Sequence, residues 1–102
     1  MSDVKIAVVD DGVSQTLFPE VQNFAVEAEG VVERRLPAGE RESHGEICLR
    51  IIRRYARVPA EWLSVQVLSR ETERGNAEKL LRALDFCGRR GAELIHMSLG
   101  SS

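Results

Sequence analysis

Val4-Lys5-Ile6-Ala7-Val8-Val9-Asp10-Asp11-Gly12-Val13 is an almost unbroken apolar run that ends on two carboxylates and a glycine. A run of this length, rich in valine and isoleucine, is typical of a strand buried on both faces of a parallel sheet. Open α/β sheets carry their chemistry at the carboxyl ends of such strands. The stretch therefore predicts an α/β fold in which Asp10 and Asp11 stand at the functional end.

The second informative stretch is Ser43-His44-Gly45-Glu46. A serine followed three residues later by a glutamate, just before an apolar-periodic segment, is a capping box and predicts the start of a helix. His44 then lies in the first turn, where the positive end of the helix dipole disfavours the imidazolium. The predicted helix presents an apolar face that consists of Ile47, Cys48, Ile51, Ile52 and Tyr55.

The rest of the chain predicts further strands over residues 31–36, 62–68 and 92–99, and a second helix that Asn76 caps. The apolar face expected for this helix consists of Ala77, Leu80, Leu81, Leu84 and Cys87. The order strand, strand, helix, strand, helix, strand predicts a parallel, helix-covered sheet of the Rossmann-like kind.

The composition limits the classes of function. A chain of 102 residues with 43% hydrophobic residues is long enough for one folded domain. The net charge of -2, with charges of both signs interspersed, offers no basic patch for nucleic acid. Apolar runs are too short to span a membrane, and a secretory signal is missing, so a cytoplasmic location is expected. Cys48 and Cys87 are expected as free thiols, and no metal or cofactor is predicted.

Three stretches together resemble the subtilisin-like serine peptidases (subtilases). Residues 6–13 look like the family's aspartate motif, in which Asp10 matches the catalytic aspartate and Asp11 replaces the usual hydroxyl residue. Ser43-His44-Gly45 looks like the histidine motif, with His44 as the catalytic base. Residues 94–100 are similar to the strand whose backbone binds substrate, which implies substrate-binding roles for Ser98, Leu99 and Gly100.

The resemblance implies nucleophilic acyl transfer by a Ser-His-Asp triad, but it covers only the N-terminal half of such a domain. The family's nucleophile lies in a Gly-Thr-Ser-Met-Ala-type motif, and an asparagine contributes to its oxyanion hole. Residues 1–102 contain neither motif. The chain alone is therefore expected to be inactive as a serine endopeptidase, and its partners would be a peptide or protein substrate and a complementing C-terminal chain.

Other interpretations of the same residues stay open. The chain could be a naturally short pseudo-peptidase that binds an extended peptide, for example in peptide maturation, without cleaving it. It could also be a homo-oligomeric interaction module, because the strand that ends at Leu99 would leave an edge for a homodimer to cover. Asp10 and Asp11 also imitate the acidic pair of receiver domains, but the chain lacks the aspartate and lysine which that site requires at later strand ends.

Overall fold

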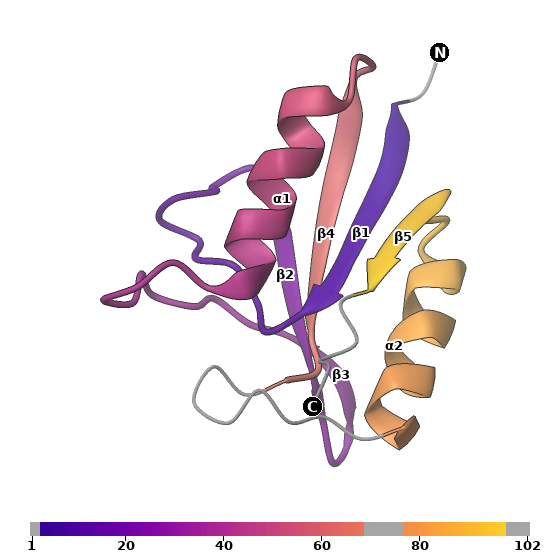
Figure 1. Ribbon diagram of the computed structural model, residues 1–102. Helices are drawn as coiled ribbons and strands as arrows, with labels where there is room; N and C mark the ends of the chain where they lie inside the picture. The colour runs from indigo at the N-terminus through magenta and orange to yellow at the C-terminus, as the bar shows by residue number, and fades with distance from the viewer. Residues whose placement is uncertain (1–2, 69–76, 98–102) are drawn as a thin grey trace.

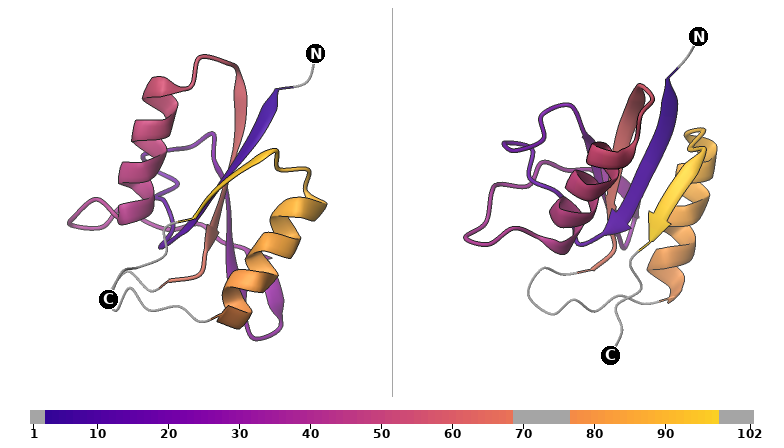
Figure 2. Two further views of the ribbon diagram at one scale, coloured as in Figure 1. Left: turned by 45° about the vertical axis from the view of Figure 1, so that its right-hand side comes forward. Right: turned by 45° about the horizontal axis from the view of Figure 1, so that its top comes forward.

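The computed structural model describes residues 3–68 and 77–97 of the chain. The elements in chain order are β1 (Val4–Asp10), β2 (Gln22–Glu27), β3 (Gly30–Glu33), α1 (His44–Tyr55), β4 (Ala60–Gln66), α2 (Ala77–Arg89) and β5 (Leu94–Met97). They form a compact α/β fold, in which α1 and α2 lie on opposite sides of one sheet (Figures 1 and 2). The predicted α/β class and the start of α1 at His44 are confirmed.

The sheet has the strand order β3-β2-β4-β1-β5 among the described residues. β1 runs parallel to β4 on one side and to β5 on the other, and β2 runs parallel to β4. The neighbouring strands on both sides explain the continuous apolar run, because from Ile6 onward β1 is buried on both faces. Ile6, Ala7, Val8 and Val9 are each at most 2% exposed.

The prediction of an all-parallel sheet is wrong at one edge, where β3 pairs antiparallel with β2. The two strands form a hairpin in which Glu27 lies opposite Gly30, and Gly30 has a φ of 137°. Such a conformation favours glycine, so the turn determines the direction of the second strand. β2 itself was not predicted, because residues 21–32 lack a clear alternation of apolar and polar side chains.

Alternate residues of β1 pack into two separate hydrophobic cores. Ile6 and Val8 pack with Leu49 of α1 on one face of the sheet, whereas Ala7 and Val9 pack with Ala83 and Cys87 of α2 on the other. This alternation follows from the pleat, which directs successive side chains to opposite faces of a strand. α1 is thereby held over the face toward which the even-numbered residues of β1 point, and Asp10 is the last of them.

The buried face of α2 agrees with the predicted one at Leu80 and Cys87 and differs from it elsewhere. Ala83 and Cys87 are fully buried, but Leu81 is 65% exposed and Ala77 is exposed as well. Periodicity alone allows the apolar stripe to rotate by one position, and contacts with the sheet select the row through Ala83 and Cys87. Asn76, the predicted cap of this helix, lies outside the described residues.

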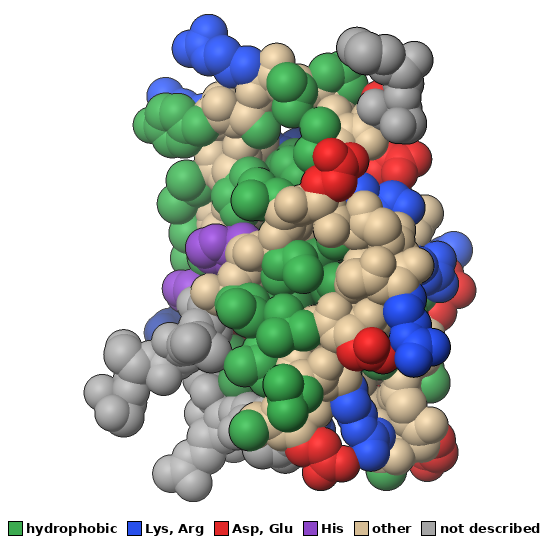
Figure 3. All heavy atoms as spheres, turned by 90° about the vertical axis from the view of Figure 1, so that its right-hand side faces the viewer, with side chains coloured by type: hydrophobic (Ala, Val, Ile, Leu, Met, Phe, Trp, Pro, Cys, Tyr) green, Lys and Arg blue, Asp and Glu red, His purple; other side chains and the backbone are tan. Residues whose placement is uncertain are grey.

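β5 forms one edge of the sheet among the described residues and is shorter than the strand predicted over residues 92–99. Its side chains Leu94 and Met97 are 52% and 38% exposed. Figure 3 shows a band of hydrophobic side chains running along the face of the molecule on this side. Neither of the two helices is long and apolar enough to cross a membrane, as far as the described residues go.

Candidate active site

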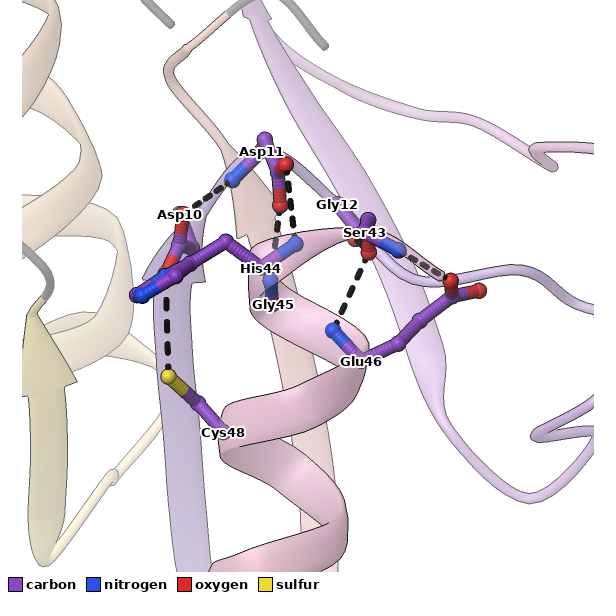
Figure 4. Close-up of polar contacts among 8 residues, drawn as sticks. All are labelled: Asp10, Asp11, Gly12, Ser43, His44, Gly45, Glu46 and Cys48. Carbon is purple, nitrogen blue, oxygen red and sulfur yellow. Dashed lines mark hydrogen bonds and ion pairs between the residues drawn. The ribbon is translucent and has the colours of Figure 1, made fainter. Parts of the chain in front are cut away.

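The structure brings Asp10 and His44 into direct contact. Asp10 is the last residue of β1 and His44 the first of α1, and Nδ1 of His44 lies 2.7 Å from Oδ2 of Asp10 (Figure 4). An ionised carboxylate can only accept a hydrogen bond, so Nδ1 carries the proton and donates it to Asp10. In the neutral imidazole, Nε2 is then the nitrogen that can accept a proton.

The two members of this pair differ strongly in exposure. The side chain of Asp10 is 1% exposed, and that of His44 is 49% exposed. Burial raises the pKa of Asp10 above its ordinary value of 3.8, and the hydrogen bond from His44 acts in the opposite direction. The charge of Asp11 raises the pKa of Asp10 further, whereas the hydrogen bond from the Asp11 backbone lowers it. A buried acceptor beside an accessible imidazole is the arrangement that orients a general base.

Asp11 has a positioning role that the sequence did not reveal. Its carboxylate accepts hydrogen bonds from the backbone N–H groups of His44 at 3.1 Å and Gly45 at 2.7 Å. The first N–H groups of a helix have no partner within the helix, and the helix dipole favours a negative charge there. Asp11 therefore ties the start of α1 to the end of β1, which keeps His44 beside Asp10.

The predicted capping box is present and extends beyond its helix. Ser43 Oγ accepts from the Glu46 N–H at 3.0 Å, and Oε1 of Glu46 accepts from the Ser43 N–H at 2.7 Å. Oε2 of Glu46 also accepts from the N–H of Ser14 at 2.7 Å, and Ser43 Oγ donates to the carbonyl of Gly12 at 2.6 Å. The cap thus anchors α1 to the loop that leaves β1.

Cys48 completes the cluster around His44, because its Sγ lies 3.6 Å from Nδ1 of the imidazole (Figure 4). A Cys-His-Asp triad would place the thiol on one ring nitrogen and the carboxylate on the other. Here both groups approach Nδ1. Burial and the charges of Asp10 and Asp11 raise the pKa of the Cys48 thiol, which disfavours the nucleophilic thiolate. The geometry therefore does not make Cys48 the nucleophile of this pair.

Among the described residues, the serines are occupied or inaccessible. Ser43 Oγ makes the cap, Ser14 Oγ accepts from the Leu17 N–H at 3.0 Å, and Ser64 is 1% exposed within β4. The predicted substrate-binding residues Ser98, Leu99 and Gly100 lie outside the described residues. Both cysteines are free thiols, as expected.

Cys87 makes the stability of the fold depend on pH in the alkaline range. Burial raises the pKa of its thiol from 9.0 to about 11. The folded-state pKa lies above the unfolded one, so the neutral Cys87 thiol contributes to the free energy of unfolding. This contribution is complete below pH 9.0 and is lost as the pH rises through about 11. We expect a loss of about 2 to 3 kcal/mol in the free energy of unfolding across that window. Urea unfolding at several pH values measures this loss. If the free energy of unfolding of Cys87→Ala fell with pH as steeply as that of the unmodified chain, the prediction would be contradicted.

A comparison of the chain with protein-family models, with curated proteins and with solved structures finds no match.

Proposed function

We propose that this chain supplies the Asp10–His44 part of a Ser-His-Asp catalytic triad in a subtilisin-like serine endopeptidase. The observation that carries the proposal is the 2.7 Å contact between the buried Asp10 carboxylate and Nδ1 of the half-exposed His44 imidazole. It lies at the carboxyl end of a central strand, the usual place for chemistry in an open α/β sheet. The capping network around Asp11 and Glu46 gives the contact the rigid support that such a base needs.

In the proposed mechanism, Nε2 of His44 takes the proton from a serine hydroxyl as the serine oxygen attacks the carbonyl carbon of the scissile peptide bond. The same proton then passes to the leaving amine as the C–N bond breaks. Asp10 keeps Nδ1 protonated and stabilises the positive imidazolium, and it is not itself protonated. The nucleophilic serine and the oxyanion donors would come from outside residues 1–102, either from a companion polypeptide or from further sequence of the same one, because no serine of these residues stands in the family's motif.

Two surfaces support a completing partner at this position. The edge of β5 that faces away from β1 pairs with no described strand, and Leu94 of β5 is 52% exposed. On α1, the side chains of Ile47, Ile51 and Tyr55 are 41%, 52% and 71% exposed. Their spacing of four residues places them on one stripe of the helix. A further strand beside β5 and an element against this stripe would remove both apolar surfaces from water.

Labelling with a fluorophosphonate, which reacts with activated serines, tests the proposal. The tagged protein is recovered gently from its host, and we expect a labelled serine on the tagged protein itself or on a companion that co-purifies with it. His44→Ala in the tagged chain should lower the labelling rate of that serine by more than about 10³-fold. Glu78→Ala provides the control, since Glu78 is exposed in the first turn of α2, outside the pair and outside β5, and should leave the rate unchanged. A serine that labels equally with His44→Ala, or a preparation that never labels, would overturn the proposal.

The open edge of β5 favours a second candidate function, the binding of an extended peptide without cleavage. A peptide strand added to this edge would gain main-chain hydrogen bonds from the residues of β5. If this function is correct, a peptide co-purifies with the chain and the fluorophosphonate labels no protein. A pure interaction module, by contrast, would keep its partner when Asp10→Ala and His44→Ala are combined, because neither side chain would then have a role in binding.

A further inference from the structure

We propose that Asp10, His44 and Cys48 together form a binding site for a divalent transition-metal cation of the Zn²⁺ class. One ligand atom from each residue, a carboxylate oxygen, an imidazole nitrogen and the thiol sulfur, lies within 4.8 Å of the other two. The carboxylate comes from the end of β1 and the other two ligands from successive turns of α1. His and Cys four residues apart on a helix share one face, so both can reach the same ion.

The distance between the sulfur and nitrogen ligand atoms equals that of a tetrahedral zinc site. Bonds of about 2.05 Å to nitrogen and about 2.3 Å to sulfur, at a tetrahedral angle, separate the two atoms by about 3.6 Å. The distance from Cys48 Sγ to His44 Nδ1 is 3.6 Å. The separation from Nδ1 to Oδ2 of Asp10 is 2.7 Å and would have to open by about 0.6 Å. The imidazole is half-exposed, so it is the ligand with room to move, whereas the carboxylate of Asp10 is buried.

The donor set selects the kind of metal. Thiolate, imidazole and one carboxylate suit Zn²⁺ and its neighbours in the first transition row, whereas Mg²⁺ and Ca²⁺ require mainly oxygen ligands. The backbone N–H of Asp11 donates to Oδ1 of Asp10 at 2.8 Å and orients Oδ2 toward the other two ligands. Three protein ligands leave the fourth position to water or to an exogenous ligand. The Cys48 thiol gives up its proton to solvent when the metal–sulfur bond forms.

The spacing of cysteine and histidine residues does not by itself indicate this site. The third ligand is an aspartate that lies 34 residues before His44 and meets it only through the packing of α1 on β1. The sequence does contain the spacing His44-x-x-x-Cys48, which puts two metal ligands on one helix face. This spacing indicates a metal site only when Asp10 is known to lie beside it.

Metal binding would also prevent the Asp10–His44 pair from acting as a base, a consequence that rests on the proposed function. For a metal to bind Nδ1, the proton on Nδ1 must leave to solvent while Nε2 takes one up, so that the neutral imidazole carries its proton on Nε2. Nε2 can then no longer accept a proton from a serine. The cation would at the same time displace the hydrogen bond between Nδ1 and Asp10. The chain would then hold its base in an inactive form until the metal is removed.

Titration with Co²⁺, which reports its ligands by absorption, tests the site on the purified chain under reducing conditions. We expect one equivalent to bind with tetrahedral d–d bands and a thiolate-to-cobalt charge-transfer band, and Zn²⁺ to displace it. Cys48→Ser should abolish the charge-transfer band, and His44→Gln and Asp10→Asn should each weaken Zn²⁺ binding by more than about 10-fold. Cys87→Ala and His96→Gln are the matched controls and should bind as the unmodified chain does, with circular dichroism to verify folding.

Absence of a cobalt complex in the folded chain would overturn the metal site, as would a charge-transfer band that persists in Cys48→Ser or disappears in Cys87→Ala. These results are independent of the peptidase proposal, because no nucleophile is needed for the spectrum. The inhibitory role is tested separately on the fluorophosphonate-labelled complex. There, Zn²⁺ should suppress labelling of the serine, and Cys48→Ser should restore labelling in the presence of Zn²⁺. Labelling that Zn²⁺ leaves unchanged would overturn the inhibitory role alone.

Discussion

Replacing Glu46 with alanine is expected to lower the free energy of unfolding by about 3 to 5 kcal/mol. Glu46 is 1% exposed, and its carboxylate accepts buried hydrogen bonds from the backbone N–H groups of Ser43 and Ser14. The truncation leaves both donors without this acceptor, creates a cavity and removes a negative charge from the helix N-terminus. Urea unfolding followed by circular dichroism measures the loss.

Glu78→Ala is the matched control, since Glu78 also lies in the first turn of a helix but is exposed. Its ion pair with Arg82 is a surface contact four residues along α2, so we expect a loss of at most about 0.5 kcal/mol. Glu46→Gln should fall between the two, because the amide retains one oxygen acceptor but directs its NH₂ group at the other N–H donor. If Glu46→Ala costs no more than Glu78→Ala, Glu46 does not anchor α1 to the loop after β1.

Two glycine-to-alanine changes in helices are expected to have opposite signs. An alanine Cβ at Gly45 would lie 2.9 Å from the carbonyl oxygen of Gly12 and 3.2 Å from Oδ1 of Asp11. The first neighbour is backbone, so α1 must move away from the end of β1. We expect Gly45→Ala to destabilise the fold by about 1 to 3 kcal/mol, as overpacking does elsewhere. The shift should also loosen the contact between His44 and Asp10.

Gly88 lies near the end of α2, and a Cβ there would meet no atom within 4 Å. Gly88→Ala should therefore stabilise the chain by about 0.4 to 1 kcal/mol, through the lower conformational entropy of the unfolded state. Urea unfolding gives both values, and the ring proton shifts of His44 in NMR spectra report the loosened contact. Gly45→Ala with the same stabilisation as Gly88→Ala would show that β1 and α1 do not approach as closely as described.

The elements with strong local signals were predicted well from the sequence. The apolar run of β1 and the Ser43–Glu46 capping box each depend on neighbouring residues, so short-range patterns sufficed for both. β2 was missed because its side chains do not alternate clearly. The face of α2 was predicted only in part: Leu80 and Cys87 pack in the core as expected, whereas Ala83 is buried there and Leu81 is exposed. The helix offers apolar residues on neighbouring rows, and only contact with the sheet selects between them.

The sequence by itself determined a central strand that ends on Asp10, and a helix that begins at His44. Only the tertiary structure decided that these two ends meet, with 2.7 Å between residues 34 positions apart. It likewise assigned Asp11 and Glu46 to the anchoring of α1, and brought Cys48 to the imidazole. The physical reason is that these contacts depend on the docking of α1 against β1 through Val8 and Leu49, and no periodicity within either element encodes the register of that docking.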